Sequence, residues 1–136
     1  MKERFGINSS FLKFGMALFF MGWGASCNAQ ATDITQAELM QRIKANQAGL
    51  ILDVRTPEEY AEGHIPGAIN IPYDHLGLRQ AEIAAHKDKD IVLYCRSGRR
   101  VGIAAGTLDS MGFKKLLHLS GDMGGWLSNG SLPVKK

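Results

Sequence analysis

The chain has 136 residues, a length that suits one domain and leaves no room for a second hydrophobic core. Its formal net charge is +3, but from Thr32 onward 13 Lys and Arg residues and 12 Asp and Glu residues give only +1. Because basic residues cluster only at Arg96, Arg99 and Arg100, this balance argues against a nucleic-acid surface and favours a small anion as the partner.

The amino-terminal segment is typical of a secretory signal. A positively charged start precedes an apolar run of 12 residues, Phe14–Ala25, which is too short to span a bilayer comfortably. Ala29 and Ala31 fit the A-x-A pattern of a cleavage site, with Cys27–Ala29 as a second choice, so we expect a signal peptide at 1–31 and a folded domain at 32–136. The expected location is periplasmic or secreted, with no stable membrane insertion after cleavage. An uncleaved anchor and a lipoprotein modified at Cys27 are the alternatives.

The folded part opens with a capping box. Thr35 is the expected N-cap of a helix, with the carboxylate of Glu38 reaching back to it, and Gly49 fits the helix end. The apolar run Leu50–Leu52 then predicts a short buried strand that ends at Asp53.

A second capping box follows that strand. Thr56 precedes Pro57, which suits the first helical position, and Glu59 is at the third. The charged residues here are Asp53, Arg55 and Glu59. We interpret them as a hydrogen-bond and ion-pair cluster that fixes the turn near the site, and direct catalysis by them is the alternative.

The next segments alternate turn, strand and helix. Residues 63–67 form a turn that leads into a strand at 68–71, and residues 73–86 predict a loop and a helix. His64 is an alternative candidate for a general base. The other histidines, including His118, lack the spacing of metal ligands, so no metal site is expected.

The most informative stretch joins a strand to a helix. Ile91–Tyr94 predicts a buried strand, and residues 101–111 predict a helix. Cys95 lies at the carboxyl end of that strand, where backbone N–H groups and the positive end of the helix dipole converge. The loop residues are Arg96, Ser97, Gly98, Arg99 and Arg100. Three guanidinium groups should favour the nucleophilic thiolate of Cys95. The structural alternative is a small buried cysteine.

A last strand is expected at residues 116–119, and a terminal helix opens near Gly121. The alternation of helix and strand predicts an α/β fold with a mostly parallel sheet covered by helices on both faces. In such sheets ligands bind at the carboxyl ends of the strands, where Cys95 is expected.

The loop and its flanking segments resemble one family. The sequence CRSGRR at Cys95–Arg100, followed by an Ala/Gly-rich helix, resembles the active-site loop of rhodanese-like sulfurtransferases. Further segments match that family in order: Asp53–Arg55, Pro57–Tyr60, Gly63–Pro72 and Gly121–Trp126. The resemblance covers roughly residues 32–129 and implies a single rhodanese-like domain with a five-stranded sheet flanked by helices. The family usually has two adjacent glycines where this chain has Gly121 and Asp122, and we expect Asp122 to serve as an N-terminal cap.

The resemblance implies sulfur transfer through a persulfide. Cys95 would take the outer sulfur of thiosulfate or a similar anionic donor, and a thiol or cyanide would remove it. Arg96, Ser97, Gly98, Arg99 and Arg100 would bind the donor and stabilise the persulfide. No metal and no organic cofactor is called for, and we expect a monomer.

Two other classes of function stay open. A phosphatase or arsenate reductase would also hold a tetrahedral oxyanion in a loop between Cys and Arg. Such loops have five intervening residues, whereas four separate Cys95 from Arg100, which predicts a tighter ring. The second alternative is a non-enzymatic sulfur carrier or redox-docking module. The sequence leaves the physiological donor and acceptor open.

Overall fold

A five-stranded sheet forms the centre of the computed structural model, which describes residues 31–136. The strands, in spatial order, are β1 (Thr32–Ile34), β5 (Leu116–Leu119), β4 (Ile91–Tyr94), β2 (Leu50–Asp53) and β3 (Ile69–Asn70). Every neighbouring pair of these strands is parallel. The predicted signal peptide lies outside the described residues, apart from Ala31.

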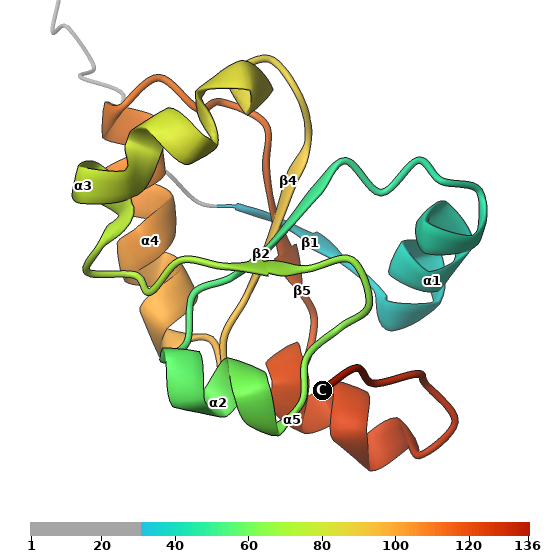
Figure 1. Ribbon diagram of the computed structural model, residues 1–136. Coiled ribbons are helices and arrows are strands. Elements are labelled where there is room, and N and C mark those ends of the chain that lie inside the picture. The colour runs from blue at the N-terminus through green and yellow to red at the C-terminus, as the bar shows by residue number, and fades with distance from the viewer. Residues whose placement is uncertain (1–30) are drawn as a thin grey trace, which may run out of the picture.

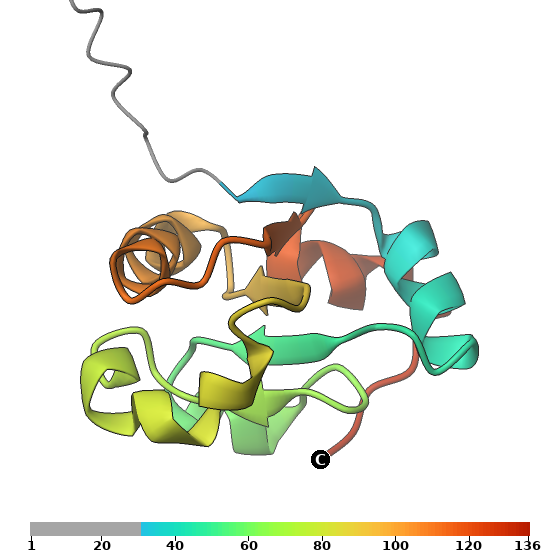
Figure 2. The same cartoon turned by 90° about the horizontal axis from the view of Figure 1, so that it is seen from above.

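Helices cover both faces of the sheet (Figures 1 and 2). One face carries α3 (Leu76–Arg79) and α4 (Arg99–Ser110), and the other carries α1 (Gln36–Lys44) and α5 (Asp122–Asn129). The short helix α2 (Pro57–Glu62) lies in front of α5 at the lower edge in Figure 1, and the two helices line one cavity. The predicted α/β class, with a sheet covered on both faces, is confirmed.

Two apolar clusters hold these layers together, one on each face of the sheet. On one side Leu52 and Leu93 pack with Leu108 of α4, and on the other Val92 packs with Trp126 of α5. All five side chains are fully buried. Burying a large aliphatic side chain contributes about 1.5–3 kcal/mol, so the alternating residues of the two central strands fix both helix layers.

Several element boundaries differ from those predicted. The first strand, β1, was not predicted, because it has three residues of which only Ile34 is buried. Helix α1 ends at Lys44, and Glu38 pairs with Arg42 instead of reaching back to Thr35. Gly49 does not end that helix: a Cβ there would lie 2.5 Å from a backbone oxygen of Asp90, so the close approach of two chain segments requires glycine.

The helix predicted within residues 73–86 is broken. Only α3 is α-helical there, and two 3₁₀ turns follow at Gln80–Glu82 and Ala84–His86. Helix α4 begins at Arg99, two residues earlier than expected, which brings its amino end closer to Cys95. The second capping box is present as predicted, with Thr56 and Glu59 bonding each other's backbone N–H groups.

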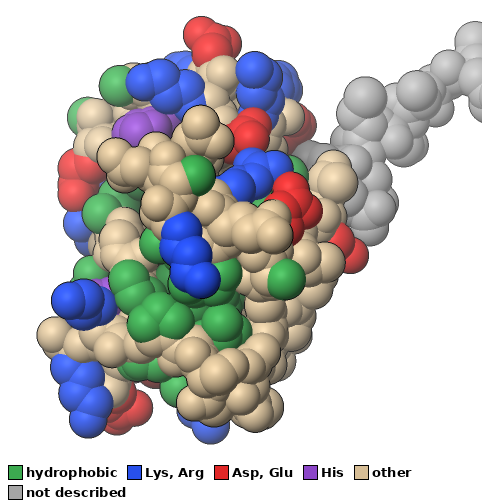
Figure 3. Space-filling view, turned by 90° about the vertical axis from the view of Figure 1, so that its right-hand side faces the viewer, with side chains coloured by type: hydrophobic (Ala, Val, Ile, Leu, Met, Phe, Trp, Pro, Cys, Tyr) green, Lys and Arg blue, Asp and Glu red, His purple; other side chains and the backbone are tan. Residues whose placement is uncertain are grey.

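The side of the molecule that carries α1 has hydrophobic side chains gathered near its centre (Figure 3). A cavity lined in part by Ile43, Ala48 and Pro66 lies among the segments around the amino ends of the strands, away from the end that carries Cys95.

Within residues 31–136, no helix combines the length and the apolar character that a membrane crossing requires.

Candidate functional site

Cys95 follows β4 directly, at the carboxyl edge of the sheet where parallel sheets bind ligands. It is a free thiol and only 1% exposed, with Val101 of α4 in the same apolar cluster. As expected, the cysteine lies between the end of a strand and the start of a helix.

Gly98 brings a hydrogen-bond donor to the sulfur. Its backbone N–H donates to Sγ of Cys95 at 2.9 Å. Gly98 is also the N-cap of α4 and has a φ of +104°, a conformation that glycine adopts without strain. The loop therefore turns back on itself, so that the amino end of α4 and its partial positive charge face the sulfur.

The three loop arginines are not equivalent. Arg96 and Arg99 are exposed, as is Ser97, whereas Arg100 is half-buried. Arg100 forms an ion pair with Glu59 of α2, with two hydrogen bonds of 2.6 and 3.0 Å. The expectation of three similar guanidinium charges around the sulfur therefore needs correction, because one of them is balanced by a carboxylate.

Glu59 links the two halves of the site. The hydrogen bond from Arg100 lowers the pKa of Glu59 to about 2, against the opposing effect of burial and with help from the backbone of Thr56. The same hydrogen bond raises the pKa of Arg100, and the charge of Cys95 adds to that effect. Helix α2 is thereby joined to the first turn of α4.

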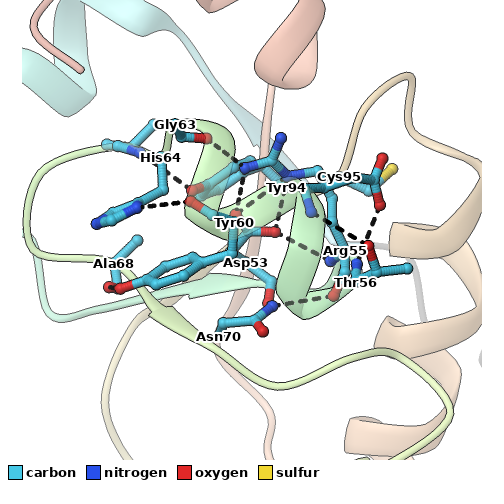
Figure 4. Close-up of polar contacts among 12 residues, drawn as sticks. Asp53, Arg55, Thr56, Tyr60, Gly63, His64, Ala68, Asn70, Tyr94 and Cys95 are labelled. Atoms are coloured by element: carbon cyan, nitrogen blue, oxygen red, sulfur yellow. Dashed lines mark hydrogen bonds and ion pairs between the residues drawn. The ribbon is translucent and has the colours of Figure 1, made fainter. Parts of the chain in front are cut away.

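Asp53 and Arg55 form a separate buried pair (Figure 4). The guanidinium of Arg55 donates to both carboxylate oxygens of Asp53, at 2.6 to 3.0 Å, and also to the carbonyl of Gly63. Asp53 is fully buried, and its pair with Arg55 ties the end of β2 to the loop before β3. From the sequence we expected these two residues to form one cluster with Glu59, whereas in the structure Glu59 pairs with Arg100.

The contacts of His64 are those of a residue that holds the fold together. Its ring stacks on Tyr60 with a centroid separation of 3.7 Å, and Nδ1 lies 2.9 Å from the carbonyl oxygen of Tyr60. The backbone of His64 pairs with Lys135. None of these contacts joins His64 to Cys95, so the structure gives no support to its role as a general base.

Two residues, Asp122 and His118, contribute to the site in a way that was not predicted from the sequence. Asp122 does not cap its own helix, because Gly121 occupies the N-cap position and Asp122 itself has a φ of +52°. Its carboxylate instead accepts the backbone N–H of Cys95 at 3.0 Å, and His118 contacts both of its oxygens. The sequence offered two signals, the i, i+4 spacing of His118 and Asp122 and the aspartate where the family usually has a second glycine.

A cavity of about 390 Å³ opens beside the loop, next to Arg96. Met123, Leu127 and Val134 give it an apolar wall, and its charged lining carries both signs, with Arg55, Arg96 and Lys136 beside Glu59 and Glu62.

Comparisons with known proteins agree over the same part of the chain. The family model described as Rhodanese-like domain matches residues 35–129. The chain is 38% identical over 102 residues to a sulfurtransferase of Allochromatium vinosum, covering 75% of this chain and 92% of that protein. It is 37% identical over 70 residues to the thiosulfate sulfurtransferase PspE of Escherichia coli, covering 52% of this chain and 67% of the relative.

Solved structures show the same fold. A rhodanese-related protein of Thermoplasma volcanium superposes with a TM-score of 0.65 at 30% identity, covering 76% of this chain and 97% of the other. A Rhodopseudomonas palustris protein described as a possible tyrosine phosphatase superposes with a TM-score of 0.68 at 29% identity, covering 79% and 87%.

Proposed function

This chain belongs to the rhodanese-like domain family, and we propose that it moves a sulfane sulfur from thiosulfate, or a similar donor, to cyanide or a thiol through a persulfide on Cys95. Sulfur transfer is the activity for which two of its relatives are named, and one of them is named for thiosulfate. The observation that carries the proposal is the 2.9 Å contact from the Gly98 N–H to the Cys95 sulfur at the amino end of α4.

The reaction consists of two displacements at sulfur. The Cys95 thiolate attacks the outer sulfur of thiosulfate, the bond between the two donor sulfurs breaks, and sulfite leaves with its electron pair. Cyanide or an acceptor thiolate then attacks the terminal sulfur of the persulfide and releases the Cys95 thiolate. Atoms and electrons balance over these two steps without an oxidant, a reductant or a cofactor.

The loop residues divide the remaining tasks. The Gly98 N–H and the amino end of α4 stabilise negative charge on the sulfur and on the persulfide. Arg96 and Arg99, which are exposed, attract and orient the anionic donor. Arg100, paired with Glu59, holds the shape of the loop.

Phosphoryl transfer is the alternative that most needs a test, because one structural neighbour is described as a possible tyrosine phosphatase. A phosphoryl group carries three oxygens around phosphorus and needs a wider ring of donors than a single sulfur atom does. Four residues separate Cys95 from Arg100, and this short spacing favours the sulfur.

A steady-state assay tests the proposal. The purified protein with thiosulfate and cyanide should form thiocyanate, whereas a Cys95→Ser variant should form none. The same preparations should cleave an aryl phosphate poorly or not at all. Rapid cleavage of the phosphate without thiocyanate formation would replace sulfur transfer with the phosphatase function.

We also propose that the protein is exported and works in the periplasm or outside the cell. The support is the sequence pattern of the amino-terminal segment alone, which lies outside the described residues. The expected monomeric state likewise stays a prediction.

A further inference from the structure

The backbone of Cys95 is held on both sides by α5. Its N–H donates to Oδ1 of Asp122 at 3.0 Å, and its carbonyl oxygen accepts the N–H of Met123 at 2.9 Å. Asp122 is 3% exposed, so its carboxylate is withdrawn from water close to the reactive sulfur. A buried carboxylate is costly without a partner of opposite charge, and its negative charge would oppose a thiolate nearby.

His118 of β5 is placed to balance that charge. Its Nε2 lies 3.0 and 2.9 Å from the two oxygens of Asp122, and its Nδ1 lies 3.4 Å from the carboxylate of Asp33 on β1. A ring protonated on both nitrogens can therefore face a carboxylate on each side. The His118 side chain is 25% exposed.

The backbone of Asp122 is in a conformation that an L-residue adopts at a cost. Its φ of +52° lies in the left-handed region, where glycine is the natural residue. The aspartate supplies what a glycine there could not, a carboxylate that accepts the N–H of Cys95.

The pair also touches the other end of the loop. A Cβ on Gly98 would lie 3.1 Å from Oδ2 of Asp122 and 3.4 Å from Cε1 of His118. Gly98 is the residue whose N–H reaches the sulfur. Asp122 and His118 therefore support the loop both where it begins, at Cys95, and where it turns.

The other charged groups near Cys95 have partners of their own or are exposed. Arg100 of α4 is paired with Glu59 of α2, and Arg55 is paired with Asp53 at the end of β2. Arg96 and Arg99 are exposed in the loop and at the start of α4. From β5, β1 and α5, the groups that face the site are His118, Asp33 and Asp122. Among these groups, Asp122 is the one whose side chain bonds the Cys95 backbone directly, and His118 is its partner.

We propose that Asp122 and His118 form a positioning pair for Cys95. Asp122 fixes the cysteine through its backbone N–H, and His118 neutralises the carboxylate so that it does not disfavour the thiolate. The inference rests on the proposed function only in taking Cys95 as the reactive group, and its test does not depend on sulfur transfer.

The test is the pH dependence of Cys95 alkylation by iodoacetamide. It is followed by mass on the peptide that contains Cys95, so that Cys27 does not interfere. In His118→Gln the Asp122 charge is left unbalanced, and the midpoint of alkylation should rise by roughly one pH unit. Below the midpoint this corresponds to about tenfold slower alkylation. In Asp122→Asn the oxygen acceptor remains but the charge is gone, so the midpoint should not rise.

The double variant His118→Gln/Asp122→Asn should return the midpoint toward that of the original protein, because the unbalanced carboxylate is absent. His75→Gln, which changes an exposed histidine paired with Asp74, is the matched control and should leave the profile unchanged. Thermal unfolding of each variant establishes that it is folded. His118→Gln decides the question even if Asp122→Asn is unstable: no rise in its midpoint, or a rise that the second substitution does not reverse, would overturn the proposal.

Discussion

The guanidinium of Arg100 contacts both oxygens of the Glu59 carboxylate, at 2.6 and 3.0 Å. The two residues lie 41 positions apart, in the first turns of α4 and α2. This pair joins the Cys95 loop to the helix that follows β2. It also balances the charge of Arg100 with a carboxylate, whereas Arg96 is exposed in the loop.

The first prediction concerns stability at low pH. The pKa of Glu59 is about 2 in the folded protein, against an ordinary value of 4.5, because Arg100 stabilises the charged form. A lowered folded pKa contributes stability that is complete above about pH 4.5 and is lost as the pH falls toward about 2. Both side chains are partly exposed, so we expect a contribution of about 1–2 kcal/mol.

Denaturant unfolding of the original protein and of Glu59→Gln, at about pH 6 and about pH 3, measures this contribution. The stability difference between the two proteins should shrink at the lower pH. Glu58→Gln, which changes an exposed carboxylate on the same helix, is the control. A difference that is equal at both pH values would contradict the ion-pair explanation.

The second prediction separates two loop arginines. Arg96→Ala should chiefly raise the thiosulfate concentration required for half-maximal rate, because an exposed guanidinium acts by steering and orienting the donor. Arg100→Ala should lower turnover, because the loop loses its pair with Glu59. Steady-state kinetics at two salt concentrations distinguish them, since added salt should weaken the contribution of Arg96. Equal effects of both substitutions, insensitive to salt, would refute this division.

The third prediction concerns Gly98. An alanine there would have to adopt a φ of +104° and place its Cβ 3.1 Å from the Asp122 carboxylate. We expect Gly98→Ala to cost about 1–3 kcal/mol of stability and to displace the N–H that reaches the sulfur. Gly106→Ala is the matched control, since a Cβ on Gly106 would meet nothing within 4 Å. The rate of thiocyanate formation and the thermal unfolding temperature should both fall in Gly98→Ala and should not fall in Gly106→Ala.

Local patterns predicted much of the fold and the position of the cysteine. The apolar run of β4, the capping box at Thr56 and the loop that follows Cys95 are each contained in a few consecutive residues. What escaped prediction depends on contacts between distant segments. Asp122 meets the backbone of Cys95 across 27 positions, and the local pattern around Asp122 does not specify that contact.

The first strand shows the same limit in a different way. Three residues with a single buried side chain give no periodicity, so β1 is recognisable only through its pairing with β5. The alternation of buried and exposed residues that reveals longer strands needs more residues than β1 has.

The fourth prediction concerns the amino-terminal segment. If it is a signal peptide, protein recovered after expression should begin near Gln30 or Thr32. The intact mass of that protein measures this directly. A full-length chain in the cytoplasmic fraction would contradict export, and a diacylated Cys27 would favour a lipoprotein.

The central claim is that Cys95 carries the transferred sulfur as a persulfide, and the most direct test is the intact mass of the protein after incubation with thiosulfate. We expect the protein to gain the mass of one sulfur atom and to lose it on adding cyanide, and we expect no gain in Cys95→Ser. A protein that keeps its original mass in thiosulfate, while remaining folded and reactive toward iodoacetamide at Cys95, would contradict the account.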